Sequence, residues 1–218
     1  MAGGLTRALF LVPIIHTQAD LGSLSESVRA LHVRKGGRGK WENHIATVNE
    51  LWKRIHDEVE RLRLDYKKVR LYQDGLPSCG HELEIVRDLA EAGSQNHGFL
   101  LELMDKGAQL VGTESPEYLI EEYHLVRLMM EQFQSDEKGR LSKGQAERST
   151  AILKKRDRYI AEKISHTLKD GETGLLFLGM LHSLEGLLPR DIRLTTLSQV
   201  AWAAGEQTKT GPTGAEED

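Results

Sequence analysis

Short runs of apolar residues alternate with longer stretches of helical periodicity along this chain. The first run covers residues 8–15 (ALFLVPII) and the fourth covers residues 174–181 (GLLFLGML). Continuous apolar runs are typical of parallel strands that are covered on both faces. Two weaker, alternating runs at residues 69–72 and 108–111 predict further strands, and residues 192–196 predict an edge strand.

Four helices are predicted between these runs. In the first, large apolar residues recur in alternating steps of four and three, at Trp41, Ile45, Val48, Trp52, Ile55, Val59 and Leu62. This Trp41 stripe predicts a helix that packs against the core, with a dimer seam as the alternative. Further helices are predicted over residues 81–106, 116–133 and 142–168, and Pro116 is typical of a first helical turn.

Strands that alternate with helices predict an α/β fold with a mainly parallel β-sheet flanked by helices. We expect a single domain over residues 1–204. Within it, a helical insertion at about 116–168 is a candidate cap over the sheet. The segment 205–218 lacks large apolar residues, so we expect a disordered tail.

The composition narrows the class of protein. A hydrophobic fraction of 39% is enough for a core, and a formal net charge of −4 argues against a general nucleic-acid binder. The single cysteine, Cys79, excludes an internal disulfide and a metal site built from several cysteines. No apolar run is long enough to span a membrane, so we expect a cytoplasmic protein. We also expect its substrate to be a small molecule.

The residues that follow the predicted strands carry the candidate chemistry. The first run leads into His16, the second into Asp74, the third into Glu114 and the fourth into His182. In an open parallel sheet, ligands bind at the carboxyl ends of the strands. We therefore expect two imidazoles and two carboxylates at one edge, where they suit acid/base hydrolysis or the coordination of a divalent metal by all four side chains.

A simpler interpretation competes with this one, because polar residues follow strands wherever the chain reaches the surface. Histidine is less common at such positions than Asp or Glu, so His16 and His182 favour a functional role over this simpler interpretation. Arg156, within a predicted helix, is a further candidate, since its guanidinium binds carboxylates and developing oxyanions. Alternatively, Arg156 and Asp157 are solvated surface charges. Neither a P-loop nor a Gly-x-Ser-x-Gly elbow occurs in the sequence.

Both ends of the chain resemble a known group. Arg156-Asp157, the following helix and Gly179-Met-Leu-His182 resemble the C-terminal signature of the erythromycin esterase / TraB / ChaN-like superfamily. Ile14-Ile-His16 is similar to the first strand and histidine of that group. Asp74 stands where a Glu commonly follows the second strand, and the glycine that usually precedes the N-terminal histidine motif is absent. The resemblance implies a histidine-centred site, in a group of esterases, metal-dependent proteases and a haem-associated lipoprotein.

These observations lead to one main hypothesis and two alternatives. The main hypothesis is a hydrolase in which His16 or His182 is the general base, Asp74 or Glu114 orients the imidazole or binds a divalent metal, and Arg156 stabilises negative charge. The first alternative is a protein that binds a small ligand or haem at the same edge. The second is an interaction module that forms a homodimer through the Trp41 stripe.

Overall fold

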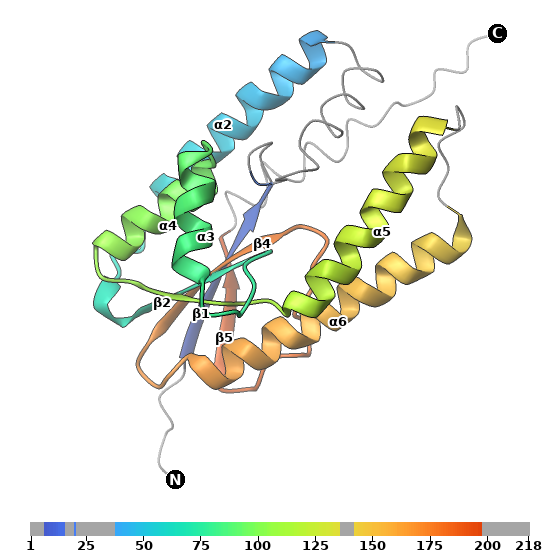
Figure 1. Ribbon diagram of the computed structural model, residues 1–218. Helices are drawn as coiled ribbons and strands as arrows, with labels where there is room; N and C mark the ends of the chain where they lie inside the picture. Colours follow the sequence, from blue (N-terminus) through green and yellow to red (C-terminus); the bar gives the residue numbers. More distant parts are fainter. Residues whose placement is uncertain (1–6, 16–19, 21–37, 136–141, 198–218) are drawn as a thin grey trace, which may run out of the picture.

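A wholly parallel β-sheet lies at the centre of the computed structural model, which describes residues 7–15, 20, 38–135 and 142–197 (Figure 1). Within these residues the sheet has five strands in the order β3-β2-β4-β1-β5. The strands are β1 (Arg7–Ile14), β2 (Val69–Gln73), β3 (Gln109–Val111), β4 (Thr173–Gly179) and β5 (Ile192–Thr196). The predicted α/β class is confirmed, and so is the edge position of β5.

Helices cover both faces of the sheet (Figure 1). The α-helices in the described part of the chain are α2 (Arg38–Arg61), α3 (Glu82–Glu91), α4 (Gln95–Asp105), α5 (Pro116–Ser135) and α6 (Lys143–Thr167). A short 3-10 helix covers Tyr66–Lys68. α2, α3 and α4 lie over one face, and the second half of α6 lies over the other. α5 packs along α6, so the predicted helical segment 116–168 forms an antiparallel pair beside the sheet.

The alternation of β4 side chains produces two separate cores. Leu175 and Phe177 point into the core shared with α2, α3 and α4, whereas Leu176 and Leu178 point into the core shared with α6. All four are almost completely buried. Coverage on both faces explains why the sequence of this strand is apolar without interruption.

The Trp41 stripe packs inward. Val48, Trp52, Ile55 and Val59 are buried in the core of the first face, while Ile45 is 40% exposed. The side chain of Trp41 itself lies outside the described residues. Trp52 and Ile55 are therefore core residues, as predicted for a helix that packs against the core.

The single helix predicted over residues 81–106 is wrong, since the chain forms α3 and α4 there. Gly93 adopts a φ of 92°, a left-handed conformation that ends α3. Ser94 then caps α4, because its side chain accepts a hydrogen bond from the backbone N–H of His97. The apolar periodicity runs across this break, which is why periodicity alone did not reveal it.

The predicted strand at 174–181 also needs correction, because β4 ends at Gly179 and the chain then turns. The N–H of His182 donates to the carbonyl of Gly179 at 3.1 Å, which closes this turn.

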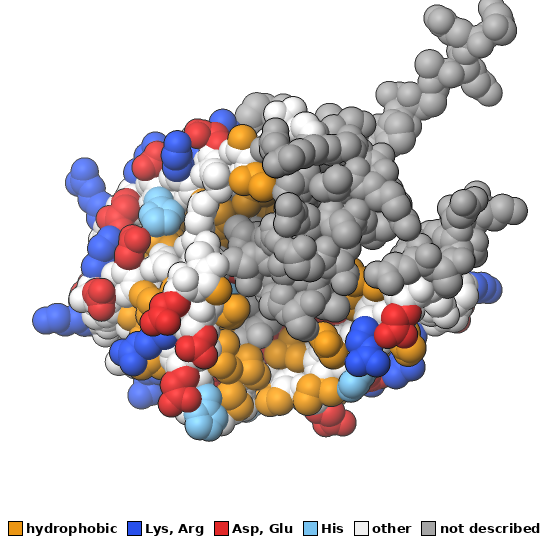
Figure 2. Space-filling model, turned by 45° about the horizontal axis from the view of Figure 1, so that its top comes forward, with side chains coloured by type: hydrophobic (Ala, Val, Ile, Leu, Met, Phe, Trp, Pro, Cys, Tyr) orange, Lys and Arg blue, Asp and Glu red, His pale blue; other side chains and the backbone are white. Residues whose placement is uncertain are grey.

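The predicted tail, 205–218, lies outside the described residues. Among the described helices, none combines the length and apolarity needed to cross a membrane. Figure 2 is turned so that the top of Figure 1, toward which β1 points, comes forward.

Candidate functional site

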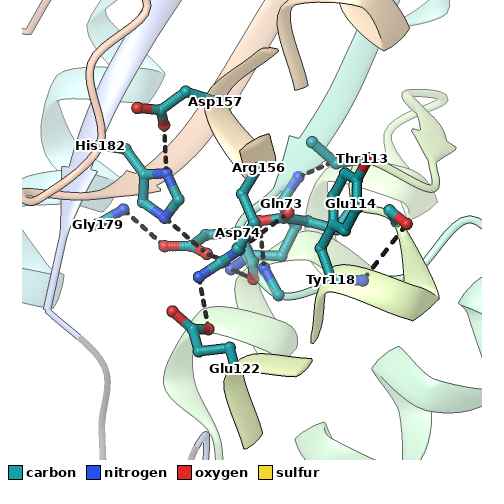
Figure 3. A network of polar contacts seen from close by, with 12 residues as sticks. Gln73, Asp74, Thr113, Glu114, Tyr118, Glu122, Arg156, Asp157, Gly179 and His182 are labelled. Carbon is teal, nitrogen blue, oxygen red and sulfur yellow. Dashed lines mark hydrogen bonds and ion pairs between the residues drawn. The ribbon is translucent and has the colours of Figure 1, made fainter. Parts of the chain in front are cut away.

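Three of the predicted site residues meet at the carboxyl edge of the sheet (Figure 3). Asp74 follows β2 directly, Glu114 follows β3, and His182 follows the turn after β4. One ligand atom from each of the three side chains lies within 4.8 Å of the others. His16 lies outside the described residues, so its place at this edge remains a prediction. β1 ends at Ile14, which pairs with Gly179.

Backbone contacts fix the two carboxylates. The N–H of Asp74 donates to the carbonyl of Phe177 at 2.9 Å, and Asp74 Oδ2 accepts from the N–H of Gly179 at 2.9 Å. Gly75 turns the chain with a φ of 77°, a conformation that glycine adopts readily. The N–H of Glu114 donates to the carbonyl of Leu76 at 2.9 Å. Asp74 is therefore tied to β4, and Glu114 is tied to the segment after β2.

Arg156 on α6 lies between these carboxylates. Its Nη2 donates to Asp74 Oδ1 at 2.7 Å and to Glu114 Oε1 at 2.6 Å, and its Nε donates to Glu114 Oε2 at 3.1 Å. Its Nη1 donates to Glu122 Oε2 on α5 at 2.7 Å. Only 6% of the Arg156 side chain is exposed, so these are buried, charge-assisted contacts.

The site holds more acidic than basic groups. Burial acts to lower the pKa of Arg156, but the hydrogen bonds and charges of Glu114, Asp74 and Glu122 outweigh it and raise that pKa above its ordinary value. Burial raises the pKa of Glu114, against the opposing effect of Arg156. Arg156 is therefore permanently charged, and its charge is shared among carboxylates from three elements of the described structure.

His182 is held between Asp74 and a further carboxylate, Asp157. Its Nδ1 lies 2.6 Å from Asp157 Oδ1, and its Nε2 lies 3.5 Å from Asp74 Oδ1. The side chain is only 4% exposed. Burial acts to lower the pKa of His182, but the contacts with Asp74 and Asp157 outweigh it and raise the pKa above its ordinary value. The imidazole is thus oriented from both sides.

Sequence reasoning missed two members of this cluster, Asp157 and Glu122. Asp157 follows Arg156 directly and was open to interpretation as a solvated charge, but the residue is only 7% exposed. Its Oδ2 also accepts from the N–H of Ser183 at 3.3 Å. Asp157 itself stands in the Arg156-Asp157 pair of the quoted signature, and that was a signal that could have identified it. Glu122 reaches the site only because α5 packs on α6, which no local pattern reveals.

Asp20 belongs to a different cluster. It contacts the Ser94 hydroxyl, and its Oδ1 lies 3.2 Å from His97 Nδ1. Ser94 Oγ lies 2.7 Å from that same nitrogen of His97. Because both groups meet one ring nitrogen, this arrangement differs from a nucleophile–base–acid relay, in which the two partners use opposite nitrogens.

The donor set formed by Asp74, Glu114 and His182 fits a divalent metal in composition. One imidazole nitrogen with carboxylate oxygens suits zinc, manganese or iron. Asp157 on the far nitrogen of His182 is the outer-shell partner that metal-binding histidines commonly have. Arg156 donates to the same oxygens of Asp74 and Glu114, so a cation there would compete with its guanidinium.

Comparisons of the chain with protein-family models, with curated proteins and with solved structures found no match.

Proposed function

We propose that this protein is a hydrolase whose general base is His182. The observation that carries the proposal is the buried Asp157–His182–Asp74 row at the carboxyl edge of a parallel sheet. Asp157 accepts a hydrogen bond from Nδ1, which leaves Nε2 as the nitrogen that accepts a proton. The resemblance of Arg156-Asp157 and Gly179-Met-Leu-His182 to the erythromycin esterase / TraB / ChaN-like superfamily supports the same assignment.

The reaction that this geometry supports is the hydrolysis of an ester or amide. The oxygen of a water molecule attacks the acyl carbon while His182 Nε2 takes its proton. The bond between the acyl carbon and the leaving group then breaks, and His182 returns the proton to that group. Asp157 and Asp74 stabilise the imidazolium between these two steps. If His16 reaches the same edge, it is a second candidate for one of these proton transfers.

We infer for Arg156 a role other than the stabilisation of negative charge that the sequence led us to expect. Its Nε and both Nη atoms already donate to Glu114, Glu122 and Asp74. A guanidinium engaged in this way is poorly placed to bind a new negative charge on a substrate. We infer that Arg156 is a positioning residue, which holds Asp74 and Glu114 at the distances that orient His182.

A divalent metal is compatible with the proposal. Asp74, Glu114 and His182 would hold it, with His16 as a further ligand predicted from sequence. When bound, such a metal lowers the pKa of its water toward about 7 and so supplies hydroxide at neutral pH. Asp157 would then orient His182 toward the metal, in the same way in which it orients the base.

The replacement His182→Ala tests the assignment. Loss of a general base is expected to lower kcat on an uncharged ester such as 4-nitrophenyl butyrate by roughly 10²–10⁴-fold. The free energy of unfolding should stay within about 1–2 kcal/mol of the parent. The matched control is His124→Ala, because His124 is an exposed histidine on α5. Unchanged turnover in folded His182→Ala would contradict the proposal.

Elemental analysis of the same purified proteins tests the metal. A stoichiometric metal in the parent and in His124→Ala that is lost from His182→Ala would support coordination by His182. The same metal content in all three proteins would argue against it. If the parent is metal-free and remains active, the metal is excluded from the mechanism.

A further inference from the structure

Two large, exposed apolar side chains directly precede His182 in the sequence. Met180 and Leu181 form the turn between Gly179, whose N–H binds Asp74, and His182. Met180 is 43% exposed and Leu181 is 84% exposed, although their neighbours in sequence belong to the site. Figure 2 shows that apolar side chains gather among charged ones on the face turned toward the viewer. An exposed leucine is common, but its position next to the proposed base is informative.

The turn is well defined. Gly179 is held by Asp74, and the N–H of His182 closes the turn onto the carbonyl of Gly179. The backbone of Met180 and Leu181 is therefore held beside His182. Leu181 directly precedes His182 and Met180 is one residue further away, so the Cα atoms of both lie within about 8 Å of the Cα atom of His182.

Charge limits what the site accepts. Among the described residues of the cluster, Asp74, Glu114, Glu122 and Asp157 outnumber the cations Arg156 and His182. Four of the five N–H groups of Arg156 donate to carboxylates. An anionic substrate would meet repulsion here without a free cation to bind it, whereas an uncharged substrate would not.

We propose that the substrate is an uncharged ester or amide with an apolar acyl group, which packs on Leu181 and Met180 while its carbonyl carbon faces His182. This inference rests on the proposed function, since it names the substrate class of the same site. Leu181 is then a specificity residue, and the surrounding carboxylates exclude phosphate esters and carboxylate-bearing molecules.

A series of 4-nitrophenyl esters tests the apolar contact. We expect kcat/KM of the parent to rise roughly 10-fold or more from the acetate to the hexanoate, because added methylenes are buried against the turn. The replacement Leu181→Ser should remove most of this rise. 4-Nitrophenyl phosphate should not be hydrolysed at a comparable rate.

The control is Leu128→Ser, which removes a leucine that is 49% exposed on α5. Leu128 lies 12 residues along the helix from Pro116, about 18 Å from the end nearest the sheet. This variant should retain the preference for the hexanoate. A parent without chain-length preference, or a Leu181→Ser variant with the parent's preference, would overturn the inference. Preferred hydrolysis of the phosphate ester would also overturn it.

A binding measurement separates this inference from the proposed function. N-hexylacetamide is uncharged and resists hydrolysis, so its effect on the backbone NMR signals of Met180, Leu181 and His182 reports binding alone. If N-hexylacetamide shifts these signals in the parent protein and hexyl phosphate does not, the preference for an uncharged apolar ligand stands even where no ester is hydrolysed. If the esters are hydrolysed without a chain-length preference, the proposed substrate class is wrong and the proposed hydrolase function stands.

Size-exclusion chromatography addresses contact with a second copy of the chain. Parent and Leu181→Ser proteins should elute with the same molecular mass. A different result would be a dimeric parent, a monomeric Leu181→Ser variant and the same ester preference in both. In that case the exposed turn is a protein interface, and the substrate assignment is wrong.

Discussion

One carboxylate, Asp157, favours a proton on Nδ1 of His182. It lies 2.6 Å from Nδ1, and it is one cause of the raised pKa of His182. Because a general base acts in its unprotonated form, the rate should increase with pH through the pKa of His182. The midpoint of that increase is expected above pH 6.5, the ordinary value for histidine.

The replacement Asp157→Asn should lower the pKa of His182, because a charged acceptor that favours the imidazolium is removed. The ascending limb of the pH–rate profile should move to lower pH, and kcat should fall roughly 10–100-fold as the imidazole loses its orientation. Titration of the His182 ring signals by NMR measures the pKa directly. Asp88→Asn, an exposed site on α3, is the control and should change neither quantity. An unchanged profile in Asp157→Asn would remove Asp157 from the mechanism.

Arg156 is the residue on which the acidic cluster depends for stability. Replacing it with Met leaves Asp74 and Glu114 buried without their counter-charge. We expect a loss of roughly 3–5 kcal/mol in the free energy of unfolding, measured by urea denaturation. Glu122→Gln should cost less than about 1 kcal/mol, since the side chain of Glu122 is 33% exposed. Similar costs for the two variants would show that the cluster does not depend on Arg156.

At the scale of elements, the close contact between β4 and its neighbours restricts which residue can occupy the second position of the strand. A Cβ atom on Gly174 would lie 2.5 Å from Leu9 Cδ1 and 3.3 Å from Tyr72 Cε2. Both neighbours are fully buried. Glycine at this position therefore allows β1, β2 and α6 to close over the same core.

Two glycine-to-alanine replacements should change stability in opposite directions. Gly174→Ala is expected to destabilise the fold by roughly 1–3 kcal/mol through overpacking. Gly98→Ala in α4 should stabilise it by roughly 0.5–1 kcal/mol, because its Cβ would meet nothing within 4 Å and alanine favours the helix. Thermal unfolding of the two variants measures both effects. Equal shifts in the same direction would contradict the packing argument.

At the scale of the whole molecule, the parallel sheet could be predicted because apolar runs such as residues 174–179 need cover on both faces. The same reasoning predicts that Asp74, Glu114 and His182 lie at one edge of the sheet, because each of them follows a parallel strand. The break between α3 and α4 was missed, since the conformation of Gly93 and the cap at Ser94 interrupt the backbone without interrupting the apolar pattern. The approach of Glu122 to Arg156 depends on how two helices pack, and the chain encodes that only through tertiary contacts.

The position of β1 has a consequence for how the molecule assembles. β1 pairs with β4 and β5, with Ala8 opposite Thr173 and Arg193. Among the described strands, β1 precedes both of its partners by more than 150 residues, so it must wait for β4 and β5 to be synthesised before it can pair with either. Contacts so distant in sequence make folding slow, and the apolar β1 segment lacks its strand partners until then. A chaperone that shields residues 8–15 during synthesis would meet a physical need that this topology creates.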